Sequence, residues 1–211
     1  MKSRSQFICA LLLASTALIS TTTFAQERRE RTIDEIKTEA VRRAEVGQYP
    51  LIGLDPADVK EAFESIHTAD KDEWAAGFMH VADRYFNEAK SLEKTDPTKA
   101  NADYIRAWRI YSFGRWPIPA SPGKQRSYEK ALEAFLAHAR FFDPPLEVVR
   151  IPFEGKEIIG YLRLPKNAKG PVPLVIAVNG LDSRKEDLTE SFSAILPFGI
   201  GYLAVDGPGT G

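Results

Sequence analysis

Residues 173–183 read PLVIAVNGLDS, and residues 201–211 read GYLAVDGPGTG. In each stretch a short, continuous apolar run ends in a turn that contains glycine, which is typical of a strand buried in a parallel sheet. The segment between them, from Lys185 to Leu196, has a helical pattern, so the three parts predict a βαβ unit. Because ligands of such units bind at the carboxyl ends of the strands, we expect any functional site near the two turns.

The residues before this unit predict a β-hairpin. Two alternating, β-rich segments, Leu146 to Phe153 and Ile158 to Leu164, flank the turn Glu154-Gly155-Lys156. A hairpin followed by a βαβ unit is the order in which an α/β-hydrolase sheet begins. Residues 146–211 therefore predict the first, incomplete half of such a sheet.

Residues 26–145 predict an all-α, cap-like domain of about five helices, so the fold class is α/β with an amino-terminal helical part. A helix from Trp74 to Ala89 shows a single apolar face. The helical pattern stops at Pro144-Pro145. The other four helices have recognisable starts, namely Thr32 with Glu35, Asp55-Pro56, Asp96-Pro97 and Ser121-Pro122.

The proline-rich loop from Gly114 to Lys124 separates the fourth and fifth helices. Its prolines and tryptophan make it stiff, so little entropy would be lost if it formed the wall of a cleft. A plain connector between two helices explains the same residues, and priors on short loops favour that interpretation.

The amino terminus predicts a secretory signal peptide over residues 1–25. Lys2 and Arg4 precede an apolar run from Phe7 to Ile19, and small residues precede a cut after Ala25. The run is short for a bilayer span, so we expect export to the periplasm or the medium rather than an uncleaved membrane anchor. Cys9, the single cysteine, lies in this segment, which leaves no disulfide or thiolate chemistry after cleavage.

Composition excludes several other functions. The chain of 211 residues is 44% hydrophobic and 27% charged, with a formal net charge of −1, so nucleic acid and anionic membranes are not expected partners. The glycines after Val205 do not fit a phosphate-binding P-loop, because position 206 is Asp and no Lys follows. We expect no cofactor and no metal.

Several short motifs occur in an order that resembles the FrsA-like α/β hydrolases, relatives of 2,6-dihydroxypseudooxynicotine hydrolase. The likeness is dense over the second half of the chain and looser over the helical part. The motifs are RWP at 115–117, SPGK at 121–124, DPPLE at 143–147, IPFEG at 151–155, GYLR at 160–163, NGLDSRKE at 179–186 and DGPGTG at 206–211.

The resemblance implies a helical domain over a hydrolase core, a Ser-Asp-His triad, and cleavage of an ester or an activated carbon-carbon bond. In this fold the backbone after the third strand supplies an oxyanion donor. The N–H of Leu181 is the best candidate here, with Gly180 second, although Asn179 stands where many hydrolases have His. A plain strand-to-helix turn, with Asp182 or Ser183 capping the next helix, is the alternative.

The triad itself is expected beyond Gly211, because no GxSxG motif occurs in the chain. His67, His80 and His138 do not follow a nucleophile and an acid in the required order, and we expect them to be solvated or packed at a helix edge. Ser183 lacks the glycine spacing of a nucleophile elbow. Candidates for lining a cleft are Asn179, Asp182 and Asp206, although capping and turn roles explain the two aspartates equally well.

Two functions remain open. The chain is expected to be a fragment of an exported serine hydrolase that is inactive alone and whose full-length form takes a small acyl or ketone substrate, with oligomers forming through the helical domain. The alternative is a non-catalytic, tetratricopeptide-like helical module with a vestigial sheet, based on the spacing of Tyr104, Trp108 and Tyr111. No repeat of 34 residues supports it.

Overall fold

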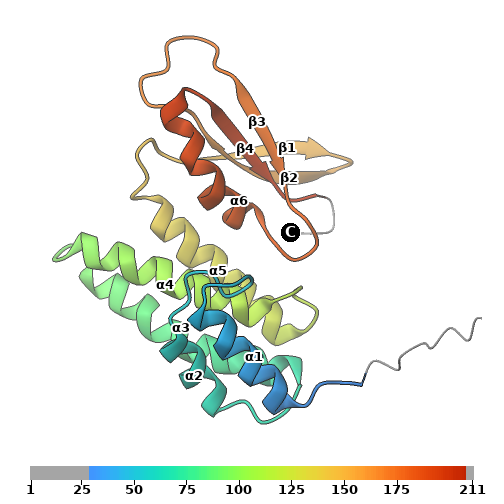
Figure 1. Ribbon diagram of the computed structural model, residues 1–211. Helices are drawn as coiled ribbons and strands as arrows, with labels where there is room; N and C mark the ends of the chain where they lie inside the picture. Colours follow the sequence, from blue (N-terminus) through green and yellow to red (C-terminus); the bar gives the residue numbers. More distant parts are fainter. Residues whose placement is uncertain (1–28, 208–211) are drawn as a thin grey trace, which may run out of the picture. The chain divides into compact units, whose positions relative to one another are not determined.

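The computed structural model describes residues 29–207, which form five helices followed by a sheet (Figure 1). The expected signal peptide, its cleavage site after Ala25 and the end of the DGPGTG motif lie outside the described residues. Residues from Arg31 onward form one compact unit. Across residues 29–207, no helix combines the length and apolar character needed to cross a bilayer.

Four of the five helices begin where local capping signals predict, and α3, for which no start was predicted, begins after Asp70. Thr32 and Glu35 exchange hydrogen bonds in a capping box, with Glu35 N–H donating to Thr32 Oγ1 at 3.2 Å. Asp55 accepts from the N–H of Ala57 at 2.8 Å. The helices are α1 Ile33–Glu45, α2 Pro56–Glu64, α3 Lys71–Leu92, α4 Pro97–Arg115 and α5 Pro122–Ala139.

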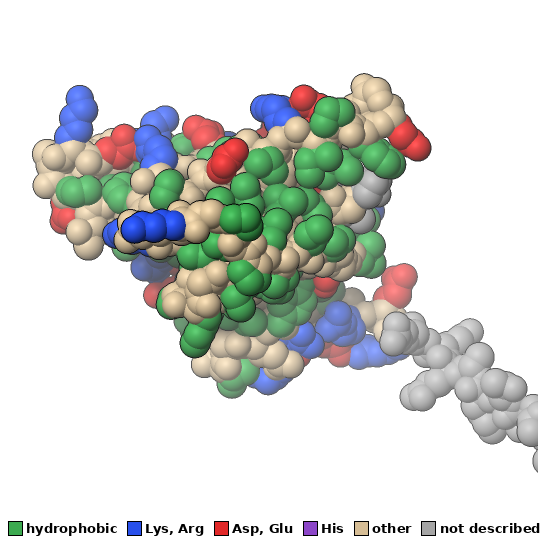
Figure 2. Space-filling view, turned by 90° about the horizontal axis from the view of Figure 1, so that it is seen from above, with side chains coloured by type: hydrophobic (Ala, Val, Ile, Leu, Met, Phe, Trp, Pro, Cys, Tyr) green, Lys and Arg blue, Asp and Glu red, His purple; other side chains and the backbone are tan. Residues whose placement is uncertain are grey.

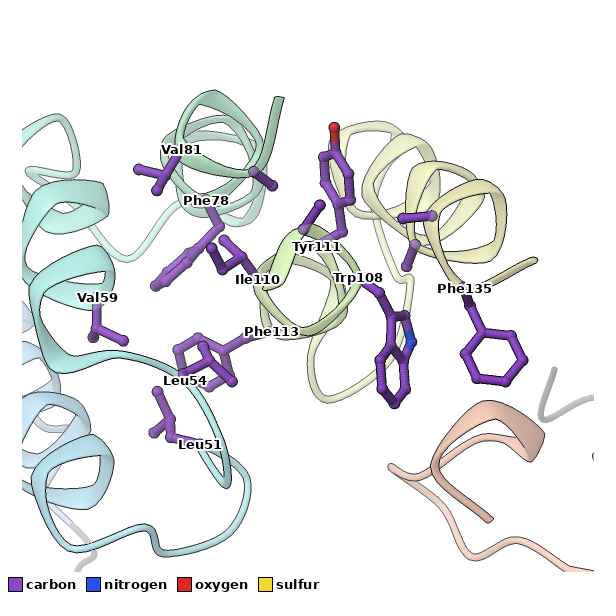
Figure 3. Close-up of a cluster of buried hydrophobic side chains, with 14 of the residues drawn as sticks. Leu51, Leu54, Val59, Phe78, Val81, Trp108, Ile110, Tyr111, Phe113 and Phe135 are labelled. Carbon is purple, nitrogen blue, oxygen red and sulfur yellow. The ribbon is translucent and has the colours of Figure 1, made fainter. Parts of the chain in front are cut away.

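Helix α4 is the centre of the helical core. In Figure 3 it lies between α3 and α5, with Phe113 and Ile110 directed toward Phe78 and with Trp108 on the side of Phe135. The rings of Phe78 and Phe113 meet edge to face with centroids 4.9 Å apart, and those of Trp108 and Phe135 lie 5.1 Å apart. These buried rings join three helices into one core.

The sheet has the order β1-β2-β4-β3, with β3 and β4 parallel and the other pairs antiparallel. The hairpin turn consists of Glu154 and Gly155, both with positive φ, a backbone that suits the twist of a two-residue hairpin. The expected hairpin and βαβ unit are therefore present. The strands are β1 Glu147–Phe153, β2 Lys156–Arg163, β3 Leu174–Val178 and β4 Gly201–Val205.

One face of this sheet is covered. Helix α6 (Lys185–Phe192) and the following 3₁₀ turn η1 (Ser193–Phe198) pack beside β4, as Figure 1 shows. Tyr161, Ala204 and Ala177 form one buried row across three strands. The ring of Tyr161 stacks on Phe135 of α5 at 5.5 Å, which joins the sheet to the helical core.

The opposite face is apolar and open to solvent. Ile176, Leu203 and Leu162 are register partners across this face. Leu174, Ile176 and Val178 are 47%, 65% and 60% exposed, although their continuous apolar run is typical of a strand buried in a parallel sheet. In the described residues β3 is instead the end strand of the sheet. Figure 2, which looks down on the side that carries the sheet, shows hydrophobic side chains gathered there.

Candidate functional site

The two turns at the ends of β3 and β4 lie side by side, and one side chain, that of Asn179, forms hydrogen bonds to both. Asn179 donates from Nδ2 to the carbonyl of Ser183 at 2.8 Å and accepts the N–H of Gly207 at its Oδ1 at 3.1 Å. Parallel pairing of Val178 with Val205 brings the two turns to the same edge. Asn179 therefore shapes the turn after β3 rather than extending into a cleft.

Leu181 is the first residue of this turn whose backbone N–H has no acceptor in the described part of the chain, and the N–H groups of Asp182 and Ser183 share this property. Its side chain is 74% exposed. Within residues 29–207 its backbone N–H meets no hydrogen-bond acceptor, whereas the N–H of Gly180 donates to Ser183 Oγ at 3.3 Å. A Cβ placed on Gly180 would meet no described atom within 4 Å. The turn thus presents a free N–H beside open space, the arrangement that an oxyanion donor needs.

The start of α6 is stabilised from two directions, and neither Asp182 nor Ser183 caps it. Arg184 occupies the N-cap position, and its N–H donates to Asp187 Oδ2 at 2.8 Å. The N–H of Lys185 donates to Asp206 Oδ1 at 2.8 Å, so the carboxylate at the end of β4 satisfies a helix-terminal donor of α6. Asp206 therefore has a capping role across the fold.

A buried charged cluster surrounds this helix start. Lys185 Nζ lies 2.7 Å from Asp206 Oδ2 and 3.1 Å from Glu186 Oε1. Burial raises the pKa of Glu186, because the carboxylate loses its hydration. Burial alone would lower the pKa of Lys185, but Glu186, Tyr128 and Asp206 outweigh it and the pKa is raised. Burial and then Glu186 also raise the pKa of Tyr128 to about 12.

Two buried arginines hold the carbonyls of the turn. Arg115, at the end of α4, donates from Nη1 to the carbonyl of Asp182 at 2.7 Å and to that of Pro117 at 3.1 Å. Arg184 donates to the carbonyls of Leu181 and Ser183 at 3.1 and 2.7 Å. Desolvation lowers the pKa of Arg115, partly opposed by the carboxylate of Asp187 at 3.6 Å.

A cavity of about 290 Å³ adjoins this turn, between the loop after α1, helix α4 and helix α6. Its aromatic and aliphatic walls come from both the helical part and helix α6, and Asp182 is at its edge. Burial and then the carboxylate of Asp182 raise the pKa of Tyr49 to about 12. The lining residues include Tyr49, Ile52, Trp108, Phe113, Trp116 and Asp182.

The other candidates lie elsewhere. Asp206 lines a separate cavity of about 390 Å³ with Tyr128, Lys185 and Gly207. His67 and His80 are exposed, as expected. His138 is buried and has hydrogen-bonding contacts with Asn101 and Glu190, which its place at the border of a helical stripe did not indicate. Across residues 29–207 no group of His, Cys, Asp or Glu could hold a metal ion.

Sequence reasoning missed two contributors to the cavity. The short segment between α1 and α2, with Tyr49 and Ile52, shows no catalytic motif. Arg115 belongs to the RWP motif, and its position before a proline-rich loop was the only available signal. Arg115 and Trp116 both line the cavity, so the loop that begins there contributes to a cavity wall besides connecting two helices.

The order of the strands, the antiparallel β2 and the glycine-containing turn after β3 define the class of an α/β hydrolase. The solved structure of 2,6-dihydroxy-pseudo-oxynicotine hydrolase has this fold, with a TM-score of 0.59 at 23% identity over 74% of this chain and 44% of that one. A structure titled AbyA5 Wildtype gives a TM-score of 0.57 at 15% identity, covering 82% of this chain and 45% of that one. The expected fold class is confirmed.

The model of the family described as esterase FrsA-like matches residues 55–211, and the chain belongs to this family. An α/β hydrolase, ucsC, from an Acremonium species is 29% identical over 79% of this chain and 37% of its own length. Esterase FrsA of Yersinia pestis is 23% identical over 75% of this chain and 42% of its own. The chain thus spans about two fifths of the length of these relatives. These matches do not favour the alternative of a non-catalytic helical module.

Proposed function

We propose that this chain is the amino-terminal part of an exported serine-type hydrolase that cleaves an ester or an activated carbon-carbon bond next to a carbonyl. The observation that carries the proposal is the free N–H of Leu181 at the carboxyl end of β3. A backbone donor fixed there can accept the negative charge that forms on a carbonyl oxygen during nucleophilic attack.

The cavity beside the turn supports a small, largely apolar substrate. Trp108, Phe113 and Trp116 provide aromatic walls in a volume of about 290 Å³. Tyr49 and Ile52 add partly exposed apolar surface at its edge, 45% and 59% exposed. Such walls bind an aromatic or aliphatic acyl group by excluding water, and the charged side chains that also line the cavity, including Arg109 and Glu190, leave room for a polar group on the substrate.

The catalytic serine, acid and histidine of this proposal follow Gly211. Within the described residues Ser183 accepts a hydrogen bond from the N–H of Gly180 and contacts no histidine, so it has no general base. The chain's share of the reaction is then to bind the acyl group and to stabilise the oxyanion. The downstream residues would supply the nucleophile and the proton transfers.

The test begins with the coding sequence beyond Gly211. We expect an open reading frame that encodes a GxSxG elbow, and the purified longer protein should hydrolyse short acyl esters or acyl ketones. A serine-to-alanine variant at that elbow is the matched control and should abolish turnover. A stop codon directly after Gly211, or a longer protein with an intact serine and no activity on either class, would refute the proposal.

Export is a separate part of the proposal, supported by the signal-like residues 1–25. Mass spectrometry of protein recovered from the periplasm or the medium should find a chain that begins at Gln26. Retention of Met1 on exported material would contradict cleavage.

A further inference from the structure

We propose that Arg115 and Arg184 are positioning residues that hold the turn of residues 179–184 in the shape that makes the Leu181 N–H an oxyanion donor. The catalytic part of this inference rests on the proposed function. The positioning itself is a property of this chain and can be tested without any activity.

The two guanidinium groups bind three consecutive carbonyls. Arg184 Nη1 binds the carbonyls of Leu181 and Ser183, at 3.1 and 2.7 Å, and Arg115 Nη1 binds the carbonyl between them, that of Asp182, at 2.7 Å. Three carbonyls in a row, each bound by a charged donor, leave the backbone of the turn few alternative conformations.

The arginine clamp, meaning Arg115 and Arg184 with the three carbonyls they bind, is held rigidly because it is buried. Arg115 and Arg184 are 3% and 2% exposed, and each has an Nε without a hydrogen-bond partner among the described residues. A buried guanidinium that has lost its water depends on the acceptors it retains, and here most of these are carbonyls of the turn. Moving the turn would therefore leave charge unsolvated, which is strongly unfavourable.

The groups on both sides of the Leu181 N–H are fixed by hydrogen bonds. On the amino-terminal side of Leu181, the N–H of Gly180 is bound to Ser183 Oγ, and on the carboxyl-terminal side the Leu181 carbonyl is bound to Arg184. The peptide unit between Gly180 and Leu181 lies between these two anchors, and its N–H, like those of Asp182 and Ser183, meets no acceptor within residues 29–207. Because the backbone on both sides is fixed, the Leu181 N–H can meet a developing oxyanion without any rearrangement of the turn during the reaction.

Arg115 also connects the helical part to the turn. It is the last residue of α4, and its hydrogen bond to Asp182 spans 67 positions of the sequence. Asp187 of α6 lies 3.6 Å from the same guanidinium and also accepts the N–H of Arg184. The Tyr128 ring of α5 lies 5.9 Å from Arg115 and 5.8 Å from Arg184. Through these contacts the packing of α4 and α5 sets the geometry of the turn.

The first test measures motion in the 211-residue chain. In the Arg115→Met variant we expect the NMR order parameters of the amides of residues 180–183 to fall from about 0.85 to below about 0.6, while those of α3 stay unchanged. The control is Arg140→Met, an arginine at the end of α5 that is paired with Glu93 and has no hydrogen bond to the turn among the described residues. If Arg115→Met does not fold, Arg115→Lys, which keeps the charge but not the fork, should show a smaller decrease confined to the turn.

The second test uses the longer, active protein. Arg115→Met should lower kcat by about ten- to a hundredfold with KM within about threefold of wild type, since a displaced oxyanion donor weakens the transition state and not the ground state. Affinity for a trifluoromethyl ketone, whose adduct carries the oxyanion, should fall in parallel. Added guanidinium ion should restore part of kcat in Arg115→Met and none in Arg140→Met.

The outcomes separate the two proposals. Unchanged order parameters at residues 180–183 in a folded Arg115 variant, or a decrease spread equally over the helices, would overturn the positioning role even if the enzyme is a hydrolase. If the order parameters of the turn fall but only KM changes and kcat does not, the link between the arginines and oxyanion stabilisation would be wrong. An inactive longer wild type would refute the proposed function and leave the first test of the clamp intact.

Discussion

Asn179 and Gly207 join the carboxyl ends of two parallel strands through one hydrogen bond, from the N–H of Gly207 to Asn179 Oδ1 at 3.1 Å. The same side chain donates to the carbonyl of Ser183 at 2.8 Å, so both functions of its amide are used. A group that both donates and accepts is required at this place, and this explains an asparagine at a position where many hydrolases have histidine.

Replacing Asn179 by Ala should destabilise the chain by about 1–3 kcal/mol, because two hydrogen bonds are lost and their partners lie partly out of solvent. Asn179→Asp should be at least as harmful, since a carboxylate oxygen would face the Ser183 carbonyl. Urea denaturation at neutral pH measures both variants. If Asn179→Asp is as stable as the wild type, the hydrogen bond that Asn179 Nδ2 donates to the Ser183 carbonyl contributes nothing to stability.

Gly180→Ala should lower the activity of the longer protein without lowering the stability of the chain. A Cβ at this position meets no described atom within 4 Å, so the 211-residue chain should keep its melting temperature or gain slightly from a less flexible unfolded state. In the longer protein the methyl group would occupy the open space beside the Leu181 N–H, and we expect kcat/KM to fall by about tenfold or more. An unstable variant, or full activity, would contradict this picture of the turn.

The ionised carboxylate of Glu190 should stabilise the folded state at neutral pH, and this stabilisation should be lost in acid. The hydrogen bond from His138 holds the pKa of Glu190 below its usual range, opposed by burial. Because the folded pKa lies below the unfolded value of about 4.3, this stabilisation is present above about pH 4.3 and is lost as the pH falls through the folded pKa. In Glu190→Gln the loss of stability on acidification should therefore be shallower, as urea midpoints between pH 3 and 7 would show.

Glu186, on the same helix, should act in the opposite direction and serves as the comparison. Burial raises its pKa, so the folded state holds a proton more tightly than the unfolded chain does. Stability should then decrease as the pH rises from about 4.3 through the raised pKa. Glu186→Gln should remove this decrease, with Asp206 still 2.7 Å from Lys185 Nζ. A steeper decrease in Glu186→Gln would contradict the assignment.

The open apolar face of β3 should limit solubility. Ile176 is 65% exposed at the end of the sheet, between the exposed Leu174 and Val178, and an unprotected edge of this kind promotes aggregation. Ile176→Lys should raise the soluble yield of residues 26–211 by several-fold without changing the far-UV circular dichroism spectrum. A soluble, monomeric wild type with a sharp melt would count against an exposed edge in solution.

The elements follow from local sequence because their signals act over a few residues. Thr32 and Glu35 stabilise a helix start within one turn, and the positive φ at Gly155 closes the hairpin within two residues. Periodicity also identifies much of the core, although Leu136, an apolar residue of α5 next to the buried Phe135, is 40% exposed. A stripe defines which side of a helix is apolar, but not how far the neighbouring element extends over it.

The sequence by itself determined the order of helices and strands, the family and the turn that carries Leu181, since each depends on short motifs. Only the tertiary structure decided what holds that turn. Asp206 caps a helix 21 positions away, and Arg115 binds a carbonyl 67 positions away. Such partners are chosen by burial, because a charge removed from water must find its acceptors among whatever groups the fold brings near it, and no local pattern encodes that choice.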